Sequence, residues 1–192
     1  MTRIIEGVTD GAGLHIGVAV ASWNQTITDR LLGGATARCE ELGVSEVTVL
    51  RVPGALELPL AAKALADSGC DAVVAIGTVV KGDTDHYEIV VRESTAGITR
   101  VALDTGIPVT NAILAVHDYG HAVERSDQRE ANKGVEAVDA AIFDGDRFGQ
   151  TRDPLRRRMR GRTSSLVSFS GQHIARAEAA ASPPGRRSRE QS

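Results

Sequence analysis

Residues 72–86 read AVVAIGTVVKGDTDH, and this stretch decides the fold class of the chain. The nearly unbroken apolar run over 72–80 is typical of a central strand that helices cover on both faces. A glycine turn follows, then Thr84 and His86, with a helical pattern over 84–104. This order places backbone N–H groups, a hydroxyl and an imidazole at the end of a buried strand, where they could hold an anion beside a proton-transfer group.

The same alternation of strand and helix runs along most of the chain. Strands are predicted at 14–21, 47–52, 72–80 and 109–116. Helices are predicted at 26–42, 55–67, 84–104, 119–125 and from 132 to about 144. Repeated units of this kind imply an α/β fold around an open, four-stranded parallel sheet with right-handed crossovers.

The charges divide the chain into two parts. Residues 1–150 carry 12 Lys and Arg and 22 Asp and Glu, a balance of −10, whereas residues 151–192 carry 10 and 3, a balance of +7. We therefore expect a folded acidic domain over 1–148 and a basic, disordered extension over 149–192. Phe169 is the one aromatic residue of that extension, so its arginines offer charge without base stacking, and nucleic acid is not an expected partner.

Cysteine usage and the lack of a leader pattern suggest a cytoplasmic protein. Cys39 and Cys70 have no CxxC spacing and are expected to be free thiols in a reducing compartment. No signal-peptide pattern opens the chain, and no apolar run approaches the ~20 residues of a membrane span. The histidines show no metal-ligand spacing, so no metal and no redox cofactor are expected.

Ligands of an open parallel sheet bind beyond the carboxyl ends of its strands. The loops expected to converge there are 22–24, 53–57, 78–86 and 110–111. Trp23 could stack on a planar heterocycle, or it could be ordinary packing. Glu57 could stabilise the start of a helix, or it could accept hydrogen bonds from a polyol or an amine.

Other candidate residues bear on charge and proton transfer. His86 has the type of side chain that exchanges protons near neutral pH, although a lone surface histidine has the same signature. The turn from Gly82 to Thr84 offers N–H donors to a phosphate, although Asp83 would repel an anion unless its side chain points away. Arg125 and Lys133 could bring positive charge to a phosphate, or they could be solvated helix charges.

Taken together, the loop segments are more specific than any one motif. They are ASWN at 21–24, VPGALELP at 52–59, AIGTVVKGDTDHYEIV at 75–90, GIPVTNAIL at 106–114, AVER at 122–125 and NKGVEA at 132–137. In this collinear order they resemble the 6,7-dimethyl-8-ribityllumazine synthase family over about residues 4–143. The resemblance implies a flavodoxin-like, three-layer α/β/α fold.

The resemblance also implies an activity, the penultimate step of riboflavin biosynthesis. That reaction condenses 5-amino-6-(D-ribitylamino)uracil with 3,4-dihydroxy-2-butanone 4-phosphate and needs no cofactor. It assigns proton transfer to His86. The implied substrate-binding residues are Trp23, Asn24, Ala55, Glu57, Thr78, Val79, Val80, Asp83, Thr84, Asn111, Arg125 and Lys133.

By the same resemblance, Asn111, Arg125 and Lys133 come from the adjacent subunit, so the site is shared within a homo-oligomer. Pentamers are implied, sometimes assembled into larger shells. The segment RIIEG at 3–7 resembles an arm that adds a strand to the sheet of a neighbour.

Some positions depart from the family pattern. Asn111 stands where many members have an aromatic residue, and residues 115–121 differ from the usual sequence. DGDRFGQ at 144–150 replaces an apolar stretch, so we expect the last helix to end near residue 144. These departures leave open a non-catalytic flavin-binding, lumazine-binding or shell-forming relative on the same scaffold.

Overall fold

The computed structural model describes residues 2, 4, 7, 9–127 and 131–152. The elements in chain order are β1 (His15–Ala21), α1 (Gln25–Glu41), β2 (Glu46–Val52), the 3-10 turn η1 (Ala55–Glu57), α2 (Leu58–Asp67), β3 (Ala72–Val80), α3 (His86–Thr105), β4 (Val109–Val116), α4 (Tyr119–Asp127) and α5 (Lys133–Arg152). Each predicted strand is present at or next to its expected bounds. Within the described residues, no helix is long and apolar enough to cross a bilayer.

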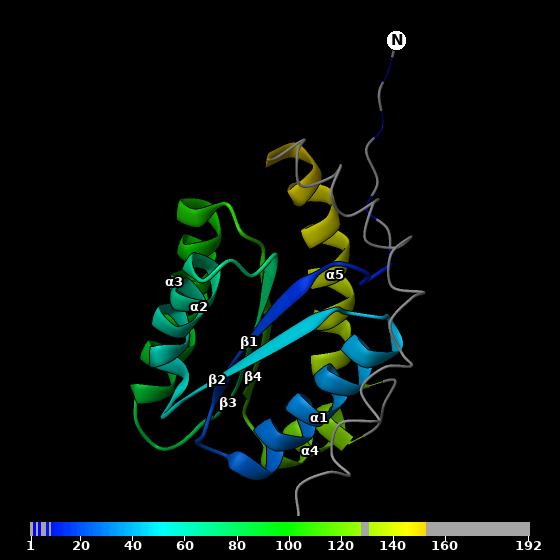
Figure 1. Ribbon diagram of the computed structural model, residues 1–192. Helices are drawn as coiled ribbons and strands as arrows, with labels where there is room; N and C mark the ends of the chain where they lie inside the picture. Colours follow the sequence, from blue (N-terminus) through cyan, green and yellow to red (C-terminus); the bar gives the residue numbers. More distant parts are fainter. Residues whose placement is uncertain (1, 3, 5–6, 8, 128–130, 153–192) are drawn as a thin grey trace, which may run out of the picture.

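The strands form one parallel sheet in the order β2-β1-β3-β4. Figure 1 shows α1, α4 and α5 on one face of this sheet and α2 and α3 on the other. β3 lies between β1 and β4, and every residue from Ala72 to Thr78 is buried. The predicted flavodoxin-like, three-layer α/β/α fold is confirmed.

Alternate side chains of β3 serve the two helical layers. Val74 and Ile76 pack with the layer of α1 and α5, whereas Val73 and Ala75 pack with the layer of α2 and α3. A fully buried Val or Ile contributes about 1.5–3 kcal/mol to stability. The central strand therefore links two hydrophobic cores, and the sheet cannot shift against either layer without losing both sets of contacts.

The second helix begins later than the sequence pattern suggests. Ala55–Glu57 forms a 3-10 turn, and the α-helix starts at Leu58, followed by Pro59. Proline suits this position because the first N–H groups of a helix have no partner within the helix. Glu57 is consequently held in a short turn beside the strand ends rather than inside a helix.

The last helix is longer than predicted. α5 continues to Arg152, so the expectation that it ends near residue 144 is wrong. Apolar periodicity is needed only where a helix packs on the core, and a Cβ at Gly145 would lie 3.4 Å from Cβ of Ala72, the first residue of β3. Beyond this contact α5 passes the amino edge of the sheet, the edge where the strands begin. Residues 153–192 lie outside the described residues, so the disorder of the extension and the boundary at 148 stay predictions.

Helices α2 and α3 approach each other closely at Gly97. A Cβ at this position would lie 2.4 Å from Cγ of Pro59, whose ring cannot rotate away. Gly33, in the interior of α1, offers a comparison, because no atom other than those of its chain neighbours and of its own helix backbone lies within 4 Å of the equivalent Cβ position.

We expect Gly97→Ala to lower the free energy of unfolding by about 1–3 kcal/mol through overpacking. Gly33→Ala should raise it by about 0.5–1 kcal/mol, since alanine favours the helix and meets no neighbour. Urea unfolding of both variants and the parent chain measures the two changes. A Gly97→Ala protein as stable as its parent would show that the two helices are not tightly packed here.

Candidate active site

The turn between β1 and α1, residues 22–24, joins the carboxyl ends of neighbouring strands. The Trp23 N–H donates to the carbonyl oxygen of Pro53, directly after β2, at 3.0 Å. The Asn24 side-chain amide donates to the carbonyl oxygen of Thr78, in β3, at 2.8 Å. The loops that follow β1, β2 and β3 therefore meet at one edge, as the sequence predicts.

An aromatic ring and a carboxylate lie around the same backbone turn. The Trp23 side chain is 63% exposed, yet its ring lies so close to Gly54 that a Cβ there would be 2.9 Å from Cε3. Oε2 of Glu57 accepts a hydrogen bond from the Gly54 N–H at 2.9 Å, while Oε1 has no partner among the described residues. Ala55, the residue after Gly54, is buried. The geometry thus leaves much of the indole and one carboxylate oxygen open to a ligand.

The end of β3 combines apolar side chains with a buried hydroxyl. Thr78 is 5% exposed, and in the described part of the chain its Oγ1 is the one buried side-chain polar atom without a hydrogen-bond partner. Val79 packs toward the layer of α2 and α3, and Val80 toward the layer of α1 and α5. The strand end therefore presents apolar groups to both layers, beside the carbonyl that Asn24 holds.

His86 is the first residue of α3 and is exposed. The next residue, Tyr87, is buried and packs edge-on against His117, with ring centroids 5.8 Å apart. Nζ of Lys81 lies 5.7 Å from the centroid of the Tyr87 ring, and the Lys81 N–H donates to the carbonyl oxygen of Val116 at 2.9 Å. The turn that carries His86 is thus held between the end of β4 and the start of α3.

The charges in the turn before α3 disfavour a bound anion unless another positive charge is present. Asp83, Thr84 and Asp85 are exposed, and α3 begins directly after them with the open N–H groups of its first turn. Two carboxylates therefore flank the helix start, and the nearby Lys81 is paired with Glu88 at 3.2 Å. A phosphate bound here would need a further positive charge.

Arg125 and Lys133 lie in the other helical layer. Arg125 belongs to α4, which packs on α1 and β4, and Nη1 of Arg125 donates to the carbonyl oxygen of His121 at 3.1 Å. Lys133 begins α5, and its Nζ pairs with Glu136 at 2.6 Å. None of their described contacts reaches His86, which begins a helix on the opposite face. Within one chain, the structure does not bring these cations into contact with the rest of the candidate site.

Asn111 is not at the carboxyl edge of the sheet. It pairs with Ala75 inside β3, so the expectation that loop 110–111 converges with the other three loops is wrong. β4 is an edge strand, where an outward polar side chain is tolerated, and Asn111 Oδ1 accepts a hydrogen bond from the Ile113 N–H at 2.8 Å. Strand alternation places Asn111 on the same sheet face as Ile113, toward α2 and α3, and it is exposed.

A groove of about 340 Å³ between α1, α4 and α5 lies apart from this site. Arg30 and Arg38 line it, and both guanidinium groups are paired already, with Asp127 at 3.2 Å and Asp139 at 2.7 Å. None of the candidate residues lines the groove, and it offers a ligand less free charge than the strand-end loops do.

The structure adds two residues to the surroundings of the site. Gly54 carries no side chain where the indole of Trp23 rests, and Tyr87 anchors the turn that presents His86. The sequence feature that could have identified Gly54 is its place in the VPGALE segment. The feature that could have identified Tyr87 is that an aromatic residue directly follows the histidine, at a helix position that faces inward.

The sequence of the chain matches a known protein family. The family profile described as 6,7-dimethyl-8-ribityllumazine synthase matches residues 13–143. The chain belongs to this family. A 6,7-dimethyl-8-ribityllumazine synthase of Kineococcus radiotolerans is 46% identical over 135 residues, which is 69% of this chain and 84% of that protein. One of Thermococcus kodakarensis is 44% identical over 141 residues, 73% of this chain and 90% of that protein.

The lumazine synthase profile covers every candidate residue and ends at residue 143. The last part of α5 and the basic extension therefore lie beyond what the profile describes. Whatever the extension does, the family match does not include it.

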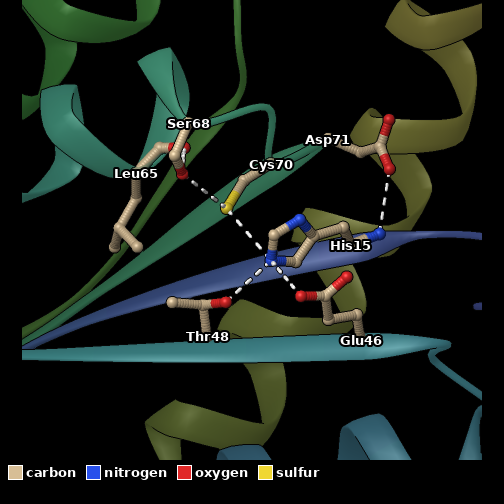
Figure 2. Close-up of polar contacts among 7 residues, drawn as sticks. All are labelled: His15, Glu46, Thr48, Leu65, Ser68, Cys70 and Asp71. Carbon is tan, nitrogen blue, oxygen red and sulfur yellow. Dashed lines mark hydrogen bonds and ion pairs between the residues drawn. The ribbon is translucent and has the colours of Figure 1, made fainter.

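A second polar cluster lies at the amino edge of the lumazine synthase fold (Figure 2). Nε2 of His15 is 2.8 Å from Oγ1 of Thr48, 3.6 Å from Sγ of Cys70 and 3.7 Å from Oε1 of Glu46. The backbone N–H of His15 donates to Oδ2 of Asp71 at 2.9 Å. These contacts tie the beginnings of β1, β2 and β3 together.

This amino-edge cluster is not arranged as a nucleophile with a relay. Cys70 is 1% exposed, and the thiol, the hydroxyl and the carboxylate all approach the same ring nitrogen of His15. In a relay the carboxylate would hold the other nitrogen. Across the described residues, no group of three or more His, Cys, Asp or Glu side chains is placed to hold a metal ion.

Both thiols should be unreactive in the folded protein. Burial raises the pKa of Cys39 to about 11, and burial is also the main cause that raises the pKa of Cys70. At pH 8 about one Cys39 side chain in a thousand would be a thiolate, and the fraction grows only as the pH rises toward its pKa. We expect a disulfide reagent such as DTNB to label neither cysteine at pH 8, and to label both after unfolding in urea. Rapid labelling of native protein would contradict the burial of these thiols.

Proposed function

We propose that the protein condenses 5-amino-6-(D-ribitylamino)uracil with 3,4-dihydroxy-2-butanone 4-phosphate to give 6,7-dimethyl-8-ribityllumazine, with release of phosphate and water. The observation that carries the proposal is family membership, with 46% identity to a protein of that name. The gathering of Trp23, Glu57 and the end of β3 at one edge supports it. The reaction is the penultimate step of riboflavin biosynthesis.

The pyrimidine is bound at the turn after β1 and the end of β3. The exposed indole of Trp23 stacks on the heterocycle, with Asn24 beside it. Backbone groups of Thr78, Val79 and Val80 line the other side of the ring. The ribityl chain is held by the backbone of Ala55 and by the Glu57 carboxylate, whose Oε1 is free to accept hydroxyl hydrogens.

The chemistry requires orientation and proton transfer. The substrate amine attacks the ketone to form a Schiff base with loss of water, phosphate leaves, and the second nitrogen closes the ring with loss of water. Both nitrogens belong to the pyrimidine, so no enzyme lysine has to become covalent. His86, exposed at the start of α3, moves the protons, and holding the two substrates together supplies the remaining acceleration.

The phosphate is held jointly by two copies of the chain. Thr84 and the N–H groups at the start of α3 contribute from one copy, where Asp83 shapes the turn. Arg125 and Lys133 contribute from the adjacent copy and supply the positive charge that the turn lacks. The support for this division is that Arg125 lies in the helical layer opposite to His86 within one chain. Asn111, exposed on edge strand β4, faces the pyrimidine of a neighbouring site.

We infer a homo-oligomer of at least five copies in the cytoplasm. Large apolar side chains are exposed on α2 and α3, with Leu60 at 74% and Leu103 at 77%, and a second copy would cover them. Val49 and Leu50 are exposed on the open edge of β2, where an N-terminal arm of a neighbour could add a strand. Residues 3, 5 and 6 of that arm lie outside the described residues. Two buried, unpaired thiols suit a reducing compartment.

The activity is tested by mixing the two substrates with the protein and following the fluorescence of the lumazine product. We expect His86→Ala to lower kcat by about 10²-fold. Arg125→Gln should raise the KM for the phosphate substrate by about tenfold, because a charge-assisted contact is lost. Arg100→Gln is the control, since Arg100 pairs with Asp104 near the end of α3. No product above the uncatalysed rate from assembled protein would refute the proposed activity.

The shared site is tested by complementation between the two defective chains. If His86 and Arg125 of one site come from different copies, co-assembled His86→Ala and Arg125→Gln chains contain about one intact site in four. With the ketone phosphate well below its KM, where Arg125→Gln sites contribute little, activity should therefore recover to about a quarter of the parent value. An equal mixture of parent chains and chains that carry both substitutions should also have about a quarter of the parent activity under these conditions. If each site lay within a single chain, the same mixture would have about half of the parent activity. Failure of the two single variants to complement would show that each site belongs to one chain.

A further inference from the structure

The backbone of Asn24, in the turn after β1, has a left-handed conformation. Its φ of 56° and ψ of 44° lie in the left-handed region, and no other described residue except glycine has a positive φ. A side chain with a Cβ is disfavoured there, and Asn is among the residues that tolerate it best. The turn after β1 is therefore held in a conformation that its sequence would not adopt readily without other contacts.

The Asn24 side chain forms no capping hydrogen bond with its own helix, α1. Asn24 is the N-cap residue of α1, where an Asn oxygen commonly accepts a hydrogen bond from the first helical turn, yet no such bond is formed. The amide instead donates to the carbonyl oxygen of Thr78, 54 residues away in sequence, at 2.8 Å. Because the partner is a carbonyl oxygen, the group that faces it has to be the NH₂ of the amide.

This bond fixes one side of the turn that carries Trp23. The other side is fixed by the Trp23 N–H, which donates to the carbonyl oxygen of Pro53 at 3.0 Å. The indole between these two anchors rests on Gly54. Without the Asn24 amide, the turn would remain attached to the loop after β2 but would lose its side-chain bond to β3.

We propose that Asn24 is a positioning residue for the pyrimidine substrate. Its amide sets the distance between the Trp23 indole and the backbone of residues 78–80, so that the two sides of the pocket fit one heterocycle. The side chain acts through Thr78, a role that goes beyond the pocket-lining role that family resemblance gives it. This inference rests on the proposed function, since it names the substrate that the pocket fits.

Two substitutions remove the amide donor while keeping the turn possible. Asn24→Gly accepts the left-handed conformation without strain and has no side chain. Asn24→Asp keeps the shape but turns a donor into a carboxylate that repels the Thr78 carbonyl, and the carboxylate can cap α1, which favours folding. Ser45→Ala is the matched control, because Ser45 Oγ likewise joins two loops, accepting from the Gly13 N–H at 2.7 Å at the amino edge.

The first measurement uses the substrate-free protein. Trp23 is the one tryptophan of the chain, so intrinsic fluorescence reports on this turn alone. We expect acrylamide to quench Trp23 about twofold more efficiently in both Asn24 variants than in the parent, and equally in Ser45→Ala and the parent. A residue that only contacts substrate would leave the free protein unchanged, so unchanged quenching in both Asn24 variants overturns the inference.

The second measurement separates the two substrates. In the lumazine assay, both Asn24 variants should raise the KM for the ribitylaminouracil about tenfold and leave the KM for the ketone phosphate within about twofold, and Ser45→Ala should change neither. Equal increases of both KM values, or an unchanged pyrimidine KM, overturn the inference.

The proposed function and this inference fail in different ways. A parent protein that forms no lumazine refutes the function. In that case quenching of Trp23 by titrated ribitylaminouracil replaces the KM, and the Asn24 variants should still bind about tenfold more weakly. Binding equal to that of the parent overturns the positioning role whatever the catalytic result.

Discussion

β3 is covered by helices on both faces, and the rest of the architecture depends on that constraint. A strand of this kind has to be apolar where both layers cover it, as the buried residues 72–77 are, and it can carry ligand-binding groups only where it emerges from the two layers. Its neighbour β1 is buried in the same way from Ile16 to Ala21, so the turn after β1 emerges beside the end of β3. Because the two buried strands end side by side, the Asn24 amide can reach the Thr78 carbonyl, and the turn that carries Trp23 lies beside the end of β3. The position of the candidate site is thus a consequence of how the core is built.

Sequence patterns predicted the strands accurately, because continuous apolar runs bounded by glycine or polar turns have few other solutions in an α/β chain. They failed for α5, since periodicity reports the packing of a helix and not its length, and the residues after Gly145 pass the edge of the sheet. They placed Asn111 correctly in the strand predicted over 109–116 but wrongly among the carboxyl-edge loops, because Asn111 is the third residue of β4 and lies near the amino end of that strand. The left-handed conformation of Asn24 could not be predicted, since its stabilising partner is 54 residues away. Local patterns thus predict elements, and contacts between distant segments decide the details of the site.

Electrostatics supply a reason for a site shared between copies that is independent of family resemblance. The start of α3 has two exposed carboxylates in the preceding turn, and Lys81 beside it is paired with Glu88. A doubly charged phosphate would meet net negative charge there, which the helix dipole offsets by only about 0.3–1 kcal/mol at an exposed site. The cations that could correct the balance are Arg125 and, once released from Glu136, Lys133, and both belong to elements on the other face of the sheet. A neighbouring copy could present that face without any change in the fold of either chain.

Backbone strain and unpaired buried polar groups also indicate that the binding pocket lies at the carboxyl edge. Asn24 in the left-handed region and the Thr78 hydroxyl without a protein partner both lie there, and features of these two kinds are generally destabilising. The amino-edge cluster differs, because His15 and Asp71 satisfy one another and their neighbours through short hydrogen bonds. A chain under selection for stability alone would relieve such costs, for instance with glycine at position 24 or valine at position 78. Their concentration at the edge that carries Trp23 and His86 is what is expected where stability has been exchanged for the geometry of a binding pocket.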